Sequence, residues 1–410
     1  MIRTKAGQDM EEPNAEPIAR AAREPRHPSL NTSLLSAASQ EDTMIEYLKS
    51  HPQGFSEMPF NSVDSLILST LSYLDLDSYP YEDVLGGRGV PVVDIVRFSK
   101  FESLLNGGWI SASKELPAFV EALLRCRRFA DLSVRYFVQE DAAVIEKQFC
   151  ACTFSFGGKT PLYYLAFRGT DGTLAGWKED FNLSYRKVIP SQRSAERYVS
   201  GVLSALPRDA RVFVGGHSKG GNLAVYAAAK CDEKTRRRIR RAYCLDAPGF
   251  RSGMFSENER AAVVPLIERY VPRESLIGML MKHSSPYTVV KSSASGAWQH
   301  DPFTWGIDGF GFEVCDELAQ SARFAHDVLN DWLARYDDGE ARVIVDAMFS
   351  AMRASGAQDF AEIIQPGPKA LALLRDAAKN TDEKTRATLM DAIGDLAEVA
   401  AHRAWYGQKR

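Results

Sequence analysis

The 410-residue sequence has few cysteines, no long apolar run and no large excess of charge of either sign. Its six cysteines follow no zinc-like spacing, which predicts reduced, half-buried thiols and a cytoplasmic location. No run approaches the roughly 18 apolar residues of a membrane-spanning helix, and residues 1–30 lack the apolar core of a signal peptide. The net charge of -3 gives no sign of nucleic-acid binding. We therefore expect a globular protein that meets lipid, if at all, by peripheral contact from the water side.

Composition divides the chain into three predicted parts. Residues 1–43 are polar and contain four prolines, so we expect a disordered segment. Residues 44–320 alternate apolar strands with helical segments, which predicts an α/β fold with a mostly parallel sheet flanked by helices. Residues 321–410 change to long helical segments and predict a helical C-terminal extension. This extension is expected to pack on the core as a cap or dimer surface, with a separate functional module as the alternative.

One segment with strand, turn and helix character carries most of the chemical information. It contains the pattern G-x-S-x-G as Gly216-His217-Ser218-Lys219-Gly220, between an apolar run at 212–214 and an alanine-rich stretch at 223–229. Such a turn, called a nucleophile elbow, presents a serine hydroxyl at a helix N-terminus, where free N–H groups favour a developing negative charge. Glycine is needed at both flanks because side chains there would collide with the neighbouring strand and helix. Ser218 is therefore the predicted nucleophile.

A serine nucleophile needs a base, and the base needs a group that orients it. In α/β hydrolases the chain order is Ser, then acid, then His. His300 lies in a polar loop after a late strand and is the expected base, with His283 as the alternative. Asp246 ends the predicted strand after the elbow and is the expected acid. Glu274 is its rival because it lies nearer to His300 in the sequence.

An oxyanion hole needs two donors that converge on one substrate oxygen. The backbone N–H of Lys219 is expected to be the first. Thr170 follows an apolar strand and an Arg-Gly turn, and can offer its N–H and its hydroxyl as the second. The Lys219 side chain has two open interpretations, a cation that attracts an anionic head group and an exposed lysine of the first helical turn.

A basic run, Lys234-Thr-Arg-Arg-Arg-Ile-Arg-Arg241, connects the elbow helix to the next predicted strand. We expect a solvated connection, with docking on an anionic membrane as the functional alternative. The run would lie at the sheet edge away from the predicted nucleophile, which argues against contact with substrate. No metal or cofactor pattern is found, so neither is expected, and no nucleic-acid partner is expected.

The segment Tyr164-Leu-Ala-Phe-Arg-Gly-Thr-Asp171, followed by Trp177, Asp180 and the elbow, resembles the pattern of fungal-type (class 3) lipases. More closely, the chain resembles a largely bacterial domain-of-unknown-function family among the lipase-like α/β hydrolases. The second resemblance covers about residues 60–310. Its motifs are Asn61-Ser-Val-Asp64, Leu71-Ser-Tyr73, Gly176-Trp-Lys-Glu-Asp180, residues 215–224, Pro248-Gly-Phe250 and Gln299-His-Asp301.

These resemblances imply Ser218 as nucleophile, His300 as base, and Thr170 and Lys219 at the oxyanion hole. The acid departs from the class 3 pattern. In the counterpart of that segment, Arg269-Tyr-Val-Pro-Arg-Glu-Ser275, a serine stands where class 3 lipases carry aspartate.

Leu245-Asp246 instead resembles the Leu-Asp that follows the next strand in pancreatic-type lipases, which favours Asp246 over Glu274. The implied function is a serine hydrolase of carboxylic esters, lipid-like ones above all, which forms an acyl-enzyme on Ser218. The expected partner is a small-molecule or lipid ester. The alternatives are an impaired hydrolase fold used as a binding or scaffold module, and a thioesterase or peptidase that uses the same serine.

Overall fold

The computed structural model describes residues 42–76, 87–98, 113–158, 161–171, 173–354 and 381–407. The segment predicted to be disordered lies outside the described residues, apart from Asp42 and Thr43. Thr43 is the N-cap of helix α1 (Met44–Ser50), where its hydroxyl accepts a hydrogen bond from the Ile45 N–H. The carboxylate of Glu46 completes the capping box by accepting from the Thr43 N–H at 3.1 Å.

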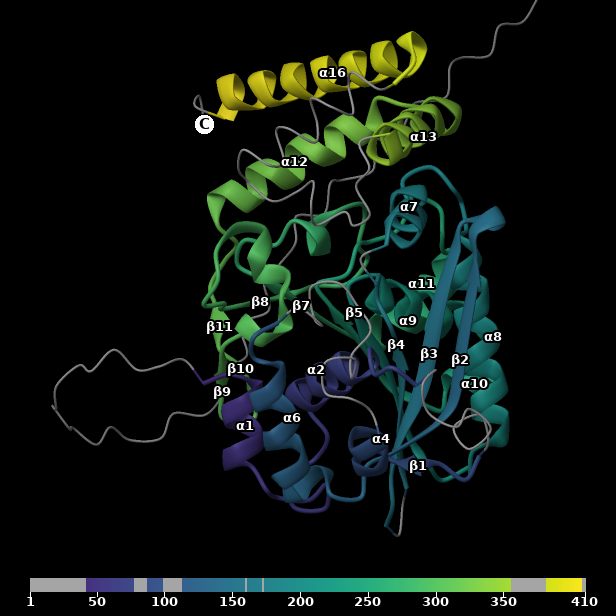
Figure 1. The fold of residues 1–410 in the computed structure, drawn as a ribbon, viewed down its shortest axis with the longest axis vertical. Coiled ribbons are helices and arrows are strands. Elements are labelled where there is room, and N and C mark those ends of the chain that lie inside the picture. Colours follow the sequence, from purple (N-terminus) through teal and green to yellow (C-terminus); the bar gives the residue numbers. More distant parts are fainter. Residues whose placement is uncertain are drawn as a thin grey trace, which may run out of the picture.

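A nine-stranded mixed sheet in the order β1-β2-β3-β4-β5-β6-β7-β8-β11 forms the centre of the molecule (Figure 1). The strands are β1 (Val90–Pro91), β2 (Ser133–Ala142), β3 (Lys147–Phe156), β4 (Leu162–Phe167), β5 (Arg211–His217), β6 (Ile239–Leu245), β7 (Ile267–Pro272), β8 (Thr288–Val290) and β11 (Val314–Cys315). A separate two-stranded sheet pairs β9 (Ile307–Asp308) with β10 (Gly311–Phe312).

The predicted α/β fold is confirmed, with one difference in the sheet. Strands β4 to β8 run parallel, whereas β1 to β4 pair antiparallel, and so do β8 and β11. The sheet is thus mixed rather than mostly parallel. The physical reason is the length of the connections. Short segments join β2, β3 and β4, and connections this short permit only antiparallel neighbours.

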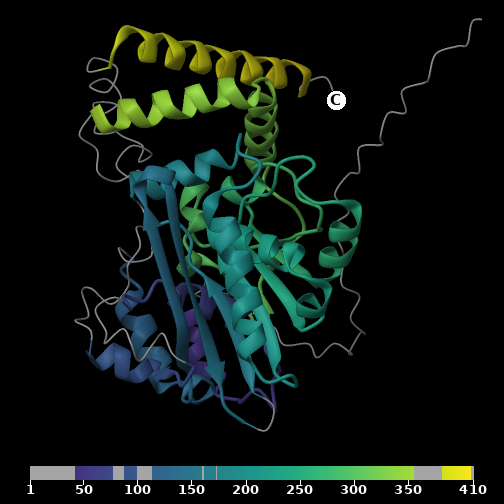
Figure 2. The same cartoon turned by 90° about the vertical axis from the view of Figure 1, so that its right-hand side faces the viewer.

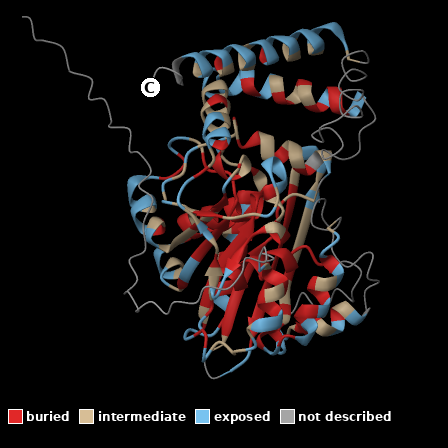
Figure 3. Cartoon of the chain, turned by 90° about the vertical axis from the view of Figure 1, so that its left-hand side faces the viewer, coloured by how far each residue is buried: buried red, intermediate tan, exposed pale blue. Residues whose placement is uncertain are grey.

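Helices cover both faces of the sheet. One face carries α8 (Pro190–Ala205), α9 (Lys219–Lys230) and α11 (Glu257–Val263), with the short α10 (Glu233–Arg236) nearby; the other carries α1, α2 (Ser62–Leu71) and α6 (Leu116–Arg125), with α4 (Val92–Phe98) beside β1. Strand β5 shows how the sequence produces two cores. Val212 and Val214 belong to the core under α8 and α9, whereas Phe213 between them belongs to the core under α2. Figure 3 shows these central strands as the buried part of the molecule.

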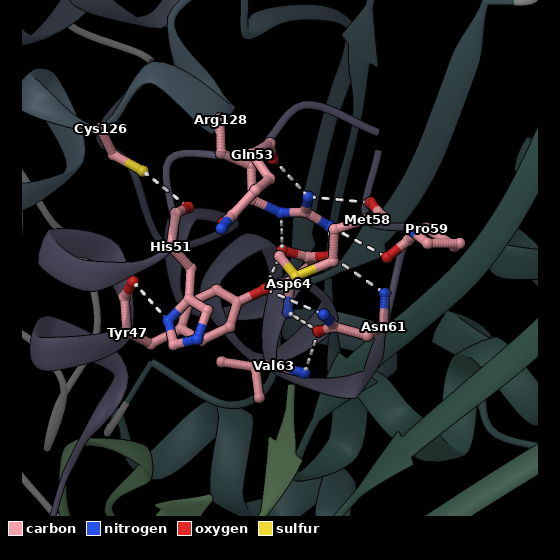
Figure 4. A network of polar contacts seen from close by, with 10 residues as sticks. All are labelled: Tyr47, His51, Gln53, Met58, Pro59, Asn61, Val63, Asp64, Cys126 and Arg128. Atoms are coloured by element: carbon pink, nitrogen blue, oxygen red, sulfur yellow. Dashed lines mark hydrogen bonds and ion pairs between the residues drawn. The ribbon is translucent and has the colours of Figure 1, made fainter. Parts of the chain in front are cut away.

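A buried ion pair fixes the helices of the second face (Figure 4). The Arg128 guanidinium donates to both carboxylate oxygens of Asp64, at 2.7 and 2.5 Å, and neither side chain is exposed. Its other N–H groups donate to the backbone carbonyls of Gln53, Met58 and Pro59. Asp64 also accepts from the N–H of the α2 N-cap, Asn61, at 3.0 Å. The Asn61–Asp64 motif therefore has a structural role, and it lies away from the cavity described below.

Three C-terminal helices lie together at one end of the sheet (Figures 1 and 2). They are α12 (Gln320–Ala334), α13 (Asp338–Ala354) and α16 (Glu383–Gly407), which confirms the helical C-terminal extension. Helix α13 packs on α7 (Leu174–Asn182) through Phe349, whose ring centre lies 5.6 Å from that of Phe181. An ion pair of 2.7 Å between Lys178 and Asp346 joins the same two helices. The domain boundary at residue 320 stays a prediction. None of the helices in the described ranges is both long and apolar enough to cross a membrane.

Candidate active site

Ser218 lies at the sharp turn between β5 and α9. Its backbone has φ 58° and ψ -135°, a conformation that costs a residue with a side chain on the order of 1–3 kcal/mol. The N–H of Ser218 donates to the carbonyl of Leu245 on β6 at 2.9 Å, and its carbonyl accepts from the Gly221 N–H at 3.0 Å. The strained turn is therefore held from both sides, by the next strand and by the first turn of the helix.

The two glycines of the pattern allow the helix to approach the sheet. A β-carbon on Gly216 would lie 2.4 Å from the carbonyl carbon of Gly220 and 2.5 Å from the Phe167 oxygen. A β-carbon on Gly220 would lie 2.0 Å from the same Phe167 oxygen. All of these are backbone atoms, so a larger residue at either position would push β4, β5 and α9 apart.

Asp246 follows β6 and forms a hydrogen bond with His300. Its Oδ2 lies 2.6 Å from the Nδ1 of His300, and its side chain is 1% exposed. Its other oxygen accepts from the N–H of Gly278 at 3.1 Å and from the hydroxyl of Ser275. Both carboxylate oxygens are therefore occupied, and Ser275, shortly after β7, supports Asp246. Asp246 and His300 line one cavity together with Ser218.

Glu274 and His283, the alternatives considered from the sequence, lie differently. Glu274 also lines the cavity, but its carboxylate accepts from the N–H of Gly296 and its own N–H donates to the side chain of Gln299 at 2.7 Å. It therefore shapes the loop that carries His300. His283 lies against Gly249, outside the residues that line the cavity. Burial lowers the pKa of His283 well below its usual value.

His300 ends a short 3-10 helix, η6 (Gly296–His300), that is anchored to the core. The indole of Trp305, which is fully buried, donates to the carbonyl of Gln299 at 2.9 Å. The ring of His217 packs on that of His300, with 4.4 Å between ring centres. Burial, and next the neighbouring His300, lower the pKa of His217 well below its usual value. His217 therefore stays neutral and adds no positive charge beside the expected base.

The two expected oxyanion donors are the backbone N–H groups of Lys219 and Thr170. Neither the N–H of Lys219 nor that of Thr170 has a hydrogen-bond acceptor among the residues the structure describes. The loop that leads to Thr170 touches the serine, since a β-carbon on Gly169 would lie 3.2 Å from the Ser218 Cβ. The Thr170 hydroxyl donates to the Asp180 carboxylate, so the backbone N–H is the donor that this residue offers.

Both interpretations of the Lys219 side chain are wrong. The side chain is 1% exposed and reaches inward, where its Nζ donates to Gln148 Oε1 at 3.0 Å. Carboxylate oxygens of Glu179 and Asp180 lie 3.3 and 3.5 Å from the same Nζ. Burial raises the pKa of Asp180 to about 6, and the Lys219 ammonium opposes that rise. Asp180 in turn holds Thr170, so one buried ion cluster connects the two residues expected at the oxyanion hole.

The cavity at this site has a volume of about 420 Å³. Ser218, Asp246 and His300 contribute polar groups, and most of the remaining lining is apolar. The apolar side chains come from α7, from residues 276–281, and from the C-terminal helices. The extension predicted from the sequence therefore covers the candidate site. Such a mainly apolar cavity with a few convergent polar groups is typical of a small-molecule site.

The chain matches one known protein family over more than half of its length. The sequence model of the Mbeg1-like family matches residues 123–350, more than half of the chain. The chain belongs to the Mbeg1-like family. The match shows a lipase-like protein, as the sequence motifs predict. It also includes α12 and most of α13, so in this Mbeg1-like chain the predicted domain boundary at residue 320 falls inside the matched region.

Other comparisons add little. Among solved structures, the M37 lipase aligns with 52% of this chain and 68% of its own length, at 15% identity and a TM-score of 0.32. A TM-score this low carries no argument about fold or activity. No curated protein matches the chain. Within the described ranges, no group of three or more His, Cys, Asp or Glu residues is placed to hold a metal ion.

Part of the basic run at residues 234–241, which extends from α10 into β6, has a structural role. The Arg236 guanidinium donates to the carbonyls of Ala228, Ala229 and Cys231 at the end of α9. Arg238 does the same for the end of α8, where it donates to carbonyls of residues 203, 206 and 207. Cations at helix C-termini stabilise the unpaired carbonyl groups there. Peripheral membrane contact stays a prediction.

Sequence reasoning missed two groups of residues at this site. The first is the cluster of Glu179, Asp180 and Gln148 around Lys219; the signal was a lysine directly after the elbow serine together with a Glu-Asp pair in the Gly176–Asp180 motif. The second is the apolar lining from the C-terminal helices, whose stripes are readable in the sequence at i, i+3, i+4 and i+7. They are Leu329, Trp332 and Leu333 on α12 with Tyr336 just after its end, and Ala341, Ile344, Val345 and Met348 on α13.

Proposed function

We propose that this member of the Mbeg1-like family is a serine hydrolase that cleaves carboxylic esters. One observation carries the proposal. Ser218, on a strained turn, lines the same cavity as His300, and the Nδ1 of His300 is hydrogen-bonded to the buried carboxylate of Asp246. The chain order Ser, Asp, His and the parallel strands β4 to β8 support an α/β-hydrolase-type fold.

In the proposed reaction the Ser218 hydroxyl attacks the ester carbonyl carbon while the Nε2 of His300 takes its proton. Asp246 fixes the tautomer, because its bond to Nδ1 keeps the proton there and leaves Nε2 as the base. The tetrahedral oxygen accepts hydrogen bonds from the N–H groups of Lys219 and Thr170. The alcohol leaves with the proton from His300, and water then hydrolyses the acyl-enzyme by the same steps in reverse.

The substrate class follows from the lining of the cavity. Apolar side chains dominate it, so it favours an ester with an apolar acyl group, and a lipid-like ester is the proposed substrate. Burial also excludes water from the reacting atoms, which strengthens the two oxyanion hydrogen bonds in the transition state.

The proposal is tested by hydrolysis of p-nitrophenyl acetate. Asp246→Asn leaves the shape of the site intact but removes the charge that holds the His300 tautomer, and is expected to lower kcat by a factor on the order of ten thousand. His300→Ala is expected to abolish turnover. Glu274→Gln and His283→Ala are the matched controls, expected to retain most activity. Loss in Glu274→Gln with little loss in Asp246→Asn would assign the acid to Glu274, and loss in His283→Ala would contradict the assigned base.

A further inference from the structure

We propose that helices α12 and α13 are the roof of an acyl-chain chamber, and that they set the length of the acyl group that the enzyme accepts. The inference rests on the proposed function and extends it to a substrate with one unbranched acyl chain of about a dozen carbons. Four kinds of observation on the cavity support it: the origin of its lining, the anchoring of its roof, the fixation of the roof on the core, and its volume.

The lining comes from two sides. The reacting groups and the segment 276–281 belong to the core, whereas α12 and α13 each contribute one apolar stripe. On α12 this stripe includes Trp332, and on α13 it includes Ile344 and Met348. Both stripes have the spacing of a single helix face. A third of the lining residues therefore belong to α12, α13 and the turn between them.

The third helix turns the aromatic roof residues toward the chamber. The indole N–H of Trp332 donates to the carbonyl of Ala392 on α16 at 3.0 Å. The Tyr336 hydroxyl donates to the Asp395 carboxylate, also on α16, at 2.6 Å. Each side chain thus satisfies its polar end on α16 and presents its apolar body to the cavity. The role of α16 is then to hold the roof residues in one orientation.

The roof is also fixed to the core, which makes the chamber preformed. Asn330 on α12 accepts from the Met281 N–H at 2.8 Å and donates to the Met279 carbonyl at 3.3 Å, so it joins the roof to the 276–281 wall. On the other side, Phe349 packs on Phe181 of α7. A preformed apolar chamber binds an acyl chain without the cost of ordering its walls.

The volume limits the occupant. A methylene group takes up about the volume of a water molecule in the liquid, roughly 30 Å³, so 420 Å³ accommodates on the order of a dozen methylene groups. That is enough for one chain and not for two. Each methylene that enters the chamber is expected to raise kcat/KM by up to about fourfold, until the chamber is full.

The experiment measures kcat/KM for p-nitrophenyl esters from acetate to hexadecanoate. The wild type is expected to rise steeply to about dodecanoate and then to level off or fall. Ile344→Trp adds the volume of about two methylene groups to the roof. It should lower the ratio of kcat/KM for dodecanoate to kcat/KM for acetate by about 15-fold. Ile344→Ala should shift the optimum to longer chains. Val343→Trp is the matched control, because Val343 is an exposed neighbour on the same helix.

A binding measurement separates this inference from the proposed function. Methyl ω-bromododecanoate should quench tryptophan fluorescence of Ser218→Ala, because Trp177 and Trp332 line the chamber, and quenching should fall in Ser218→Ala with Trp332→Phe. If acetate hydrolysis requires Ser218 but neither Ile344 variant changes the chain-length profile, the proposed chamber is overturned and the proposed hydrolase function stands. Quenching without hydrolysis of any ester would refute the hydrolase and retain the chamber. Absence of quenching overturns the chamber.

Discussion

Replacement of Lys219 by methionine tests whether the buried cluster beside the elbow stabilises the fold through its charge. Methionine keeps the length and apolar stem of the side chain and removes the ammonium. The carboxylates of Glu179 and Asp180, which are 0% and 14% exposed, then lose their cation. Removal of one partner from a buried ion pair typically costs 3–5 kcal/mol, so we expect a loss of about this size in the free energy of unfolding.

The control is Lys230→Met at the other end of the same helix. Lys230 pairs with Glu259 at 2.8 Å, but the two side chains are 22% and 28% exposed. A pair this accessible is expected to contribute at most about 1 kcal/mol. Urea unfolding of both variants at about pH 8, followed by circular dichroism, measures the difference.

The pH dependence gives a second readout. Burial raises the pKa of Asp180 to about 6 in the folded protein even with Lys219 present, and loss of the ammonium raises it further. The folded variant therefore binds a proton over a pH range in which the unfolded chain has released it, so its stability falls as pH rises through that range. The cost of Lys219→Met should be smaller at about pH 5 than at about pH 8. A cost equal to that of Lys230→Met, or one independent of pH, would refute the reasoning.

Two further predictions concern the loop that carries His300 and the elbow at Ser218. Burial raises the pKa of Asp301 from 3.8 to about 6, so the wild type should lose up to about 3 kcal/mol of stability relative to Asp301→Asn as pH rises from about 3 to about 7, measured by urea unfolding across that range. Gly220→Ala places a methyl group against the Phe167 carbonyl and should cost about 1–3 kcal/mol and most ester turnover. Gly201→Ala, in helix α8 with open space around it, should instead stabilise by about 0.5–1 kcal/mol; equal effects of the two substitutions on thermal unfolding would contradict the steric explanation.

The elements that the sequence predicts best are those with local causes. The strand, the turn and the alanine-rich helix around Ser218 follow from apolar runs and paired glycines within residues 212–229. The α/β class follows from the alternation of such runs along the chain. The mixed character of the sheet was harder to predict, because pairing direction depends on where the strands between β1 and β4 meet in space rather than on their composition.

The contacts that sequence reasoning missed join residues far apart in the chain. Lys219 contacts Glu179, which lies 40 positions away in the sequence. The presence of a lysine after the elbow serine does not by itself indicate whether its side chain is exposed or buried. The Asp246–His300 bond, which was predicted, spans 54 positions, and the sequence favoured Asp246 over Glu274 through its place at a strand end and through resemblance. The stripes on α12 and α13 predict buried faces, but periodicity alone does not say that they border a cavity rather than a core.

The central claim is that Ser218 is a nucleophile activated by His300. The most direct measurement is mass spectrometry of tryptic peptides after reaction of the folded protein with a fluorophosphonate. Cleavage after Arg211 and Lys219 gives a peptide of residues 212–219 in which Ser218 is the single hydroxyl-bearing side chain. We predict an adduct on this peptide, its absence in Ser218→Ala, and much slower formation in His300→Ala. An adduct on another peptide, or equal modification of the Ser218→Ala protein, would contradict the claim.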